Sequence, residues 1–306
     1  MKKFKGYFSL LSKGLITILL LFFVSREVDF SSLKIRFMGL QWHFILISFS
    51  LLLIQVPLMS YRWSMILNKE LELFTQKKLI LTYWLGLFFN QILPSSIGGD
   101  FLRGYYLNSE GNKKFIYVSV ILDRFMGLYS LSILSFFSSL FFIDLNESYF
   151  FTFIYIVFFS LCLMVVFVSL FGEKKLFSSK TNRIFIYINY LLTEARTLFL
   201  SNLFLNLILI SILLHLLSIT SVFFISKGLG INIGYEIFLI IVPVVLLFVS
   251  IPISFGGWGL RENIFVITML NFSIPGEDSL AISLLFGIMT VLISLPGLYI
   301  WVKKYF

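Results

Sequence analysis

Long apolar stretches follow one another along the whole chain and are separated by short polar connections. A transmembrane helix needs about 20 mostly apolar residues to cross the hydrocarbon core. The chain is 59% apolar and only 13% charged, so a soluble globule of this length could not cover its apolar surface with polar groups. We therefore predict an all-α polytopic membrane protein that forms a single integral membrane domain over residues 1–306. The eight apolar stretches are 7–25, 41–61, 79–93, 115–142, 149–171, 203–226, 236–256 and 279–302.

Two of these stretches run into closely similar segments. The decapeptides 94–103 and 252–261 match without gaps at six positions, which are Pro, Ser, Gly, Gly, Leu and Arg. They lie 158 residues apart, which is close to half of the 306-residue chain. Similarity at a fixed offset is the signature of an internal repeat. We predict two repeats, at about 1–143 and 149–306.

The distribution of basic residues indicates how the repeats lie in the membrane. If all eight stretches cross, the basic loop 172–202 faces outward and the acidic loop 143–148 faces inward, against the positive-inside rule. If 79–107 and 236–271 are instead re-entrant helical hairpins, about six helices cross and 17 of the 24 Lys and Arg residues, Arg62 among them, lie inside. Three crossings per repeat is an odd number, so the second repeat is inverted. We expect a bacterial-type cytoplasmic membrane with both termini cytoplasmic.

Broken helices at corresponding positions of two inverted halves mark the central site of a transporter. Pro cannot continue a helix and Gly-Gly permits a sharp turn. A new half-helix is therefore expected after each Gly-Gly pair, with free N–H groups and a positive dipole end at the break. Guanidinium groups bind phosphate in a bidentate way, so the sequence predicts an anion site. The predicted substrate-binding residues are Arg103, Arg261, Gly98, Gly99, Gly256, Gly257 and Asn90.

Other polar residues at membrane depth are expected to support this site. Asp123 and Arg124 are adjacent, point about 100° apart on a helix, and must find partners elsewhere. Asn90 can hydrogen-bond either a headgroup or the unwound backbone, and His215 is expected to hydrogen-bond between helices. The alternative is that the acidic residues only neutralise the arginines and serve structure alone. The predicted supporting ion network consists of Asp100, Asp123, Arg124 and Glu262.

Three motifs, in order, resemble a known family. They are Asn90-x-x-x-Pro94-x-x-x-Gly98-Gly99-Asp100-x-x-Arg103, Asp123-Arg124-x-x-Gly127-Leu128 and Pro252-x-x-x-Gly256-Gly257-x-Gly259-x-Arg261-Glu262. Together they look like the lysylphosphatidylglycerol synthase transmembrane region, a flippase-like domain that also occurs as stand-alone membrane proteins. The resemblance covers nearly the whole chain and implies lipid translocation. The soluble aminoacyl-transferase domain of the fused synthases is missing, so synthase activity does not follow from it.

The leading hypothesis is a flippase or scramblase for an anionic phospholipid or a polyprenyl-phosphate-linked lipid, without enzymatic activity. Two alternatives stay open: a membrane-embedded lipid-modifying transferase that uses a carboxylate as acid or base, and a non-transporting assembly subunit of a cell-envelope machine. The expected partners are membrane lipids and a separate lipid-synthesising enzyme. The net charge of +9 is interpreted as an orientation signal, so no nucleic acid is expected. The sequence shows no metal-ligand cluster, and we expect no metal and no cofactor. Oligomeric state is left open.

Overall fold

The computed structural model describes residues 13–22, 30–67, 74–93, 98–107, 112–142, 149–171 and 183–303, and all regular structure in these segments is helical. The predicted all-α class is confirmed. After a short apolar helix at Lys13–Phe22, the helices are α2 (Phe30–Met38), α3 (Trp42–Ile66), α4 (Gln76–Ile92), α5 (Gly98–Leu107), α6 (Lys113–Phe142), α7 (Tyr149–Phe171), α8 (Arg183–Phe199), α9 (Leu203–Gly228), α10 (Tyr235–Val249), α11 (Leu260–Leu270) and α12 (Gly276–Val302).

Four helices, α3, α6, α9 and α12, are long and apolar enough to cross a bilayer. Each has at least 25 residues, and a rise of 1.5 Å per residue carries such a helix across a core of about 30 Å. The protein is thus a multi-pass membrane protein, as predicted. Of the other two predicted crossings, 149–171 coincides with α7, and 7–25 lies partly outside the described residues.

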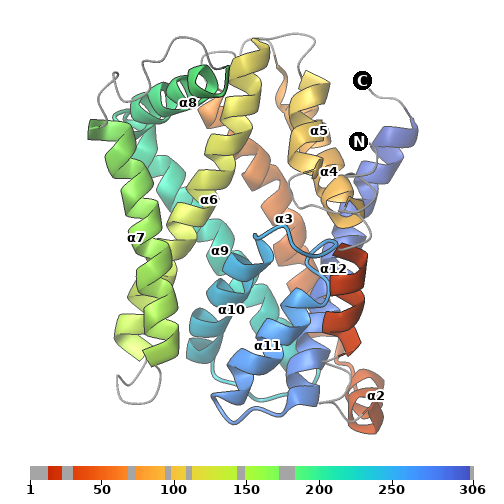
Figure 1. Ribbon diagram of the computed structural model, residues 1–306. Coiled ribbons are helices and arrows are strands. Elements are labelled where there is room, and N and C mark those ends of the chain that lie inside the picture. The colour runs from red at the N-terminus through yellow and green to blue at the C-terminus, as the bar shows by residue number, and fades with distance from the viewer. Residues whose placement is uncertain are drawn as a thin grey trace.

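The four short helices α4, α5, α10 and α11 form two packed pairs at different levels of the molecule. Helices α4 and α5 pack together in the upper half of Figure 1, and α10 and α11 pack together in the lower half. The turn segment 250–259 that joins α10 to α11 lies near mid-height. Residues 94–97, which connect α4 to α5, lie outside the described residues. Helix α2 lies at the lower edge of this view and α8 at the upper edge.

Helices α3 and α9 pack along each other at the centre of the molecule. Serines line the seam. Ser48 Oγ lies 2.6 Å from Ser221 Oγ, and Ser218 donates to Gln55 Oε1 at 3.1 Å. Small side chains let helix backbones approach closely in a membrane, and their hydroxyl groups hydrogen-bond across the contact. Because the α9 residue numbers fall as the α3 numbers rise, the two helices are antiparallel.

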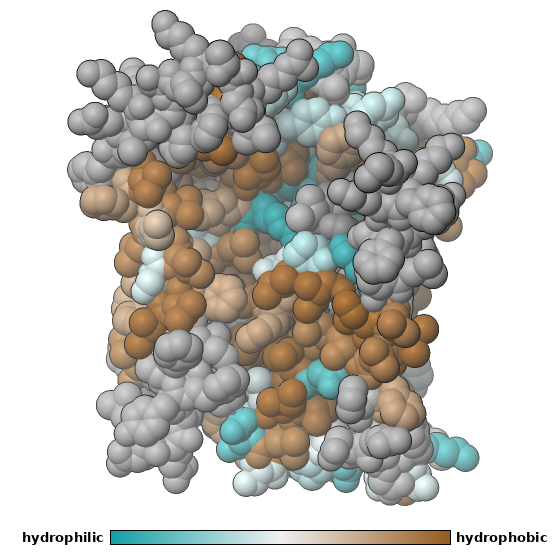
Figure 2. Space-filling view, viewed as in Figure 1, coloured by the Kyte–Doolittle hydropathy of each residue, from teal (hydrophilic) through white to brown (hydrophobic). Residues whose placement is uncertain are grey.

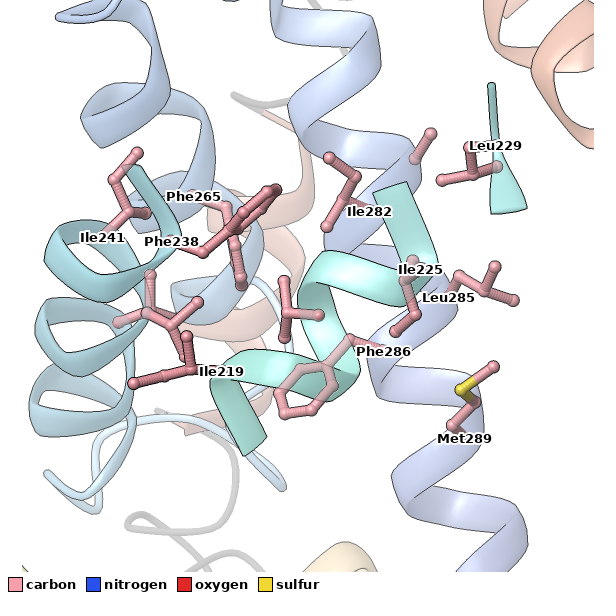
Figure 3. Packing of buried hydrophobic residues seen from close by; sticks show 14 of the residues in the cluster. Ile219, Ile225, Leu229, Phe238, Ile241, Phe265, Ile282, Leu285, Phe286 and Met289 are labelled. Carbon is pink, nitrogen blue, oxygen red and sulfur yellow. The ribbon is translucent and has the colours of Figure 1, made fainter. Parts of the chain in front are cut away.

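The largest apolar core joins α3, α9, α10, α11 and α12. Figure 3 shows side chains of three helices in this core, among them Ile219 and Ile225 of α9, Phe238 and Ile241 of α10, and Phe286 of α12. These side chains are at most 5% exposed. The core fixes α10 against the long helices, and so determines where the following turn segment 250–259 lies.

Candidate functional site

The first helix break is held by a contact between α4 and α5. Asn90 Oδ1 of α4 accepts a hydrogen bond from the Gly99 backbone N–H at 2.9 Å, so this side chain caps the start of α5. A Cβ atom at Gly99 would overlap the Gly86 carbonyl oxygen, which only a glycine avoids. Of the two predicted roles for Asn90, the structure shows the contact with the backbone. Helix α5 begins at Gly98 itself rather than after the glycine pair.

The second break uses its glycines differently. Gly256, Gly257 and Gly259 have φ values of +54°, +80° and +79°, in a region that side chains disfavour and glycine adopts freely. The backbone therefore stays non-helical up to Gly259, and α11 starts only at Leu260. Glu262 Oε2 accepts from the Gly259 N–H at 2.6 Å and caps this helix. The same Gly-Gly signal thus permits close helix packing at one break and a turn at the other.

The two breaks lie against each other, although they are far apart in sequence. A Cβ atom at Gly256 would lie 3.1 Å from both the backbone and the side-chain oxygen of Gln91, at the end of α4. Arg124 of α6 donates to Asp100 Oδ2 at 2.5 Å and to the Ser250 carbonyl oxygen at 3.0 Å. This arginine therefore connects α5 to the beginning of the second break.

Arg103 is a buried guanidinium with two acidic neighbours. Its Nη1 donates to Asp123 Oδ2 at 2.9 Å, and its Nε lies 3.3 Å from Asp100 Oδ1. The rings of Trp63 and Tyr83 each lie 4.7 Å from the guanidinium carbon, and cation–π contacts of this kind favour a desolvated cation. The arginine is 2% exposed, so the packing fixes its position.

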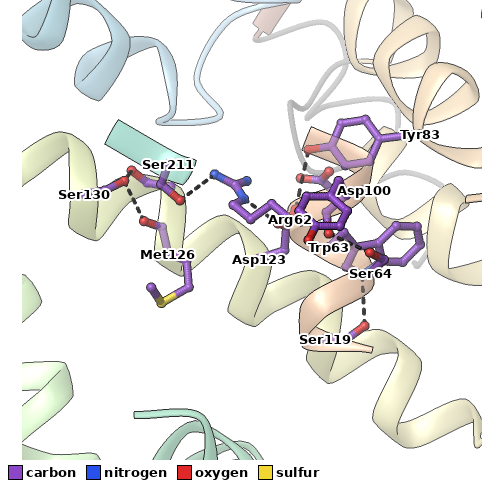
Figure 4. Close-up of polar contacts among 12 residues, drawn as sticks. Arg62, Trp63, Ser64, Tyr83, Asp100, Ser119, Asp123, Met126, Ser130 and Ser211 are labelled. Atoms are coloured by element: carbon purple, nitrogen blue, oxygen red, sulfur yellow. Dashed lines mark hydrogen bonds and ion pairs between the residues drawn. The ribbon is translucent and has the colours of Figure 1, made fainter. Parts of the chain in front are cut away.

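Arg62 belongs to the same cluster, although the charge distribution predicts a cytoplasmic position for it. Helix α3 continues past the apolar stretch to Ile66 and holds Arg62 inside the molecule, 6% exposed. Its Nε donates to Asp123 Oδ1 at 2.8 Å and its Nη1 to Ser211 Oγ at 3.1 Å. Figure 4 shows Arg62 between Asp123 and Ser211. The inside count of basic residues is therefore lower by one, which leaves the charge argument for orientation intact.

The Asp123-Arg124-x-x-Gly127 motif now has a physical explanation. Asp123 and Arg124 do not pair with each other, because they point in different directions, and each binds partners on other helices. Gly127 leaves room for the Arg62 guanidinium, whose Nη1 would lie 3.4 Å from a Cβ atom at this position. The Gly127 carbonyl oxygen also lies 2.9 Å from His215 Nε2 of α9, which confirms the expected interhelical contact of His215.

These side chains line a cavity of about 270 Å³. Met59, Leu128, Leu131, Leu214 and Leu246 form its apolar wall. Among the described residues that line it, three guanidiniums face two carboxylates, which leaves an excess of one positive charge at neutral pH. Figure 2 shows hydrophilic residues recessed between hydrophobic ones near mid-height. The charged residues that line the cavity are Arg62, Arg103, Arg124, Asp100 and Asp123.

Arg261 and Glu262 form a separate pair that is not among the residues lining this cavity. Arg261 Nη2 and Nε donate to Glu262 Oε1 at 2.6 and 3.1 Å. The guanidinium carbon lies 4.6 Å from the Trp258 ring centroid, and a Cβ atom at Gly287 of α12 would overlap the guanidinium. The structure thus brings Arg103 together with Asp100, Asp123 and Arg124, while Arg261 is held in a neutral pair of its own.

The guanidiniums at the charged cavity can bind an anion by charge and by hydrogen bonds. A metal site is a different matter, because no group of three or more His, Cys, Asp and Glu side chains within the described residues could hold a metal ion. Each of the acidic residues Asp100, Asp123 and Glu262 is engaged by an arginine. The fold and this site define a polytopic α-helical membrane protein with a charged cavity among its helices.

The family follows from a comparison with family models. Residues 10–297 match the model described as Lysylphosphatidylglycerol synthase TM region. The chain therefore belongs to this family, and the predicted family membership is confirmed. A search of curated proteins found no match.

Proposed function

We propose that this protein moves a lipid with an anionic headgroup between the leaflets of the membrane, and that the headgroup binds in the charged cavity. The observation that carries the proposal is the excess of one guanidinium over the carboxylates among the described residues that line this cavity. One arginine at the bilayer centre costs about 2.5–3.5 kcal/mol on insertion scales. An anionic phosphodiester or polyprenyl phosphate would supply the missing negative charge and accept hydrogen bonds from the guanidiniums.

The proposal includes two inverted repeats. The order of helices supports it, because α3 to α6 and α9 to α12 each run as one long helix, two short packed helices and another long helix. The packing pattern supports it as well: α4 packs against α12, and its counterpart α10 packs against α6, the counterpart of α12. Equivalent helices of inverted repeats run in opposite directions, and α3 and α9 are antiparallel.

The proposal also includes two re-entrant hairpins. Helices α4, α5, α10 and α11 have 17, 10, 15 and 11 residues. At 1.5 Å per residue, none of them reaches across a core of about 30 Å. Non-helical backbone at membrane depth is tolerated where it is buried in protein or lines a polar cavity. Gln91, at the end of α4, contacts Gly256, in the segment between α10 and α11. This contact is expected if the tips of the two hairpins meet between the leaflets.

In this mechanism the headgroup enters the cavity while the acyl or prenyl tails remain in lipid. Arg62 and Arg103 are positioned by Asp123, which orients both guanidiniums. Arg124 joins α5 and α6 to Ser250 at the second break. This contact between the two halves is the one that we expect to break and re-form as they rock against each other. We expect the protein to act in a cytoplasmic membrane, with both termini on the cytoplasmic side, next to an enzyme that makes its lipid.

Reconstituted vesicles test the proposal. Dithionite abolishes the fluorescence of nitrobenzoxadiazole (NBD)-labelled phosphatidylglycerol in the outer leaflet only. About half of the fluorescence is therefore lost in empty vesicles, and more than half is lost when a protein moves labelled lipid to the outer leaflet. We expect Arg62→Gln to slow this process at least about 10-fold, in line with the loss of a charge-assisted contact. In the control Lys303→Gln, the substituted residue follows the last residue of α12 and is not among those that line the cavity, so the rate should be unchanged.

The same experiment separates the alternatives. If folded parent protein leaves the label in its original leaflet, the transport proposal is wrong. A chemically new lipid in the extract would then indicate a membrane-embedded transferase. An inactive protein that copurifies with a stable partner would instead indicate an assembly subunit.

A further inference from the structure

A second basic site lies outside the charged cavity, in a groove between α6 and α8. The groove has a volume of about 490 Å³, in the range of small-molecule sites. Its wall is apolar and aromatic, and two lysines from the first turn of α6 lie beside it. It shares no lining residue with the charged cavity. The residues that line the groove include Lys113, Lys114, Tyr117, Ile121, Tyr187 and Leu191.

Helix α8 gives the groove its position. Apolar residues recur at helical spacing in the segment 172–202, at Ile184, Ile188 and Leu191, and this pattern predicts an amphipathic helix on the membrane surface. In the structure, α8 runs along the upper edge of Figure 1 beside the start of α6. Leu191 of α8 faces the groove, together with Tyr117 and Ile121 of α6. An amphipathic helix in this location places its apolar side at the level of the acyl chains and its polar side at the level of the headgroups.

The two lysines carry positive charge that no described carboxylate neutralises. Neither Lys113 nor Lys114 forms an ion pair with a carboxylate in the part of the chain that the structure describes. Lys114 Nζ instead lies 4.1 Å from the Tyr190 ring centroid and 5.3 Å from that of Tyr187. Two cations thus lie at one end of an apolar groove at the membrane surface. A phospholipid combines the complementary features, a negative phosphate and an apolar chain.

We propose that this groove binds one anionic phospholipid, with its phosphate at Lys113 and Lys114 and a chain along Tyr117, Ile121 and Leu191. Basic pockets between helices on the cytoplasmic side of a membrane bind lipid headgroups, and each lysine near such a surface favours an anionic lipid. The site is separate from the transport cavity, so it does not depend on the transport proposal. The bound lipid would hold α8 against α6.

A tryptophan reporter in the groove tests the site directly. Tyr187 is 59% exposed, so Tyr187→Trp changes one exposed aromatic residue for another. The fluorescence of this variant, minus that of the parent, is measured in two series of phosphatidylcholine vesicles. The quencher is dibrominated phosphatidylglycerol in one series and dibrominated phosphatidylcholine in the other, each at increasing mole fraction. We expect quenching at a mole fraction of brominated phosphatidylglycerol about 10-fold lower than for the phosphatidylcholine.

Two variants in the reporter background show whether the lysines cause this preference. Lys113→Gln with Lys114→Gln should bring the two quenching curves together. Lys303→Gln should leave the two curves apart, because Lys303 does not line the groove. Lys303 is a matched control, since it also lies above an aromatic ring, that of Tyr299 at 5.9 Å. The site is overturned if the two lipids quench equally, if the preference survives the double substitution, or if soluble glycerol phosphate removes the quenching.

Discussion

The two arginines that follow the repeated Gly-Gly pairs have different surroundings. Arg103 shares Asp123 with Arg62 and lines a cavity, in a cluster with more guanidiniums than carboxylates. Arg261 has Glu262 as its own partner, beside Trp258 and Gly287, and does not line that cavity. The same motif therefore has different surroundings in the two halves, and we propose that it contacts a ligand in the first half and holds the helix break in place in the second. The neutral pair has no charge left for a ligand.

The largest expected effect comes from removing the shared carboxylate. Asp123→Ala leaves two buried guanidiniums without their common acceptor, whereas Glu262→Ala leaves one guanidinium and one uncapped N–H group. Breaking a buried pair costs about 3–5 kcal/mol, so both variants should unfold at lower temperature, Asp123→Ala more so. Thermal unfolding in detergent measures this order. A larger loss for Glu262→Ala would mean that the second break carries more of the stability than the cluster does.

Two glycines next to the arginines sharpen the comparison. A Cβ atom at Gly287 would overlap the Arg261 guanidinium, whereas one at Gly127 would lie 3.4 Å from Arg62 Nη1. Overpacking of a filled site costs about 1–3 kcal/mol, so we expect Gly287→Ala to lower the unfolding temperature more than Gly127→Ala. Gly127→Ala should in turn slow lipid translocation more, since it shifts Arg62. The reverse order in both measurements would contradict the roles assigned to the two arginines.

The smallest expected effects concern two buried serines. Ser211 Oγ accepts a hydrogen bond from Arg62, and losing a bond to a charged group costs about 1.5–3 kcal/mol. Ser254 Oγ, at the second break, is buried and has no hydrogen-bond partner in the described structure. Ser211→Ala should therefore lower both stability and translocation rate, while Ser254→Ala should leave both unchanged or slightly raise stability. Equal losses in the two variants would show that Ser254 has a role that its contacts do not reveal.

The sequence predicted the helices well because long apolar runs leave few alternatives in a membrane protein. The stretches 41–61, 203–226 and 279–302 correspond to α3, α9 and α12, each with ends that differ by a few residues. These differences had a consequence at Arg62, since α3 continues for five residues beyond the apolar stretch. A polar stripe at seven-residue spacing, Ser48, Gln55 and Arg62, was the signal that could have placed this arginine inside.

The sequence could not separate the functions of the two Gly-Gly pairs. Both have the same residue types at the same spacing, but their backbone conformations depend on tertiary neighbours, Gly86 for Gly99 and Glu262 for Gly259. The sequence also could not separate the surroundings of Arg103 and Arg261. Their difference arises from Asp123 and Arg62, and the residues 158 positions after these two are uncharged. The joint phosphate site of Arg103 and Arg261 stays a prediction of the sequence, and the cluster without Arg261 is the proposal that the geometry favours.

The headgroup preference of the two arginine variants decides between these arrangements. Translocation of NBD-labelled phosphatidylglycerol and phosphatidylcholine is measured side by side in vesicles that contain folded parent, Arg103→Gln or Arg261→Gln protein. Our account predicts that Arg103→Gln loses the preference for the anionic lipid, whereas Arg261→Gln is less stable and slower but keeps the parent ratio of rates. An equal loss of preference in both variants, or an unchanged preference in Arg103→Gln, would contradict the assignment of the site to the first-break cluster.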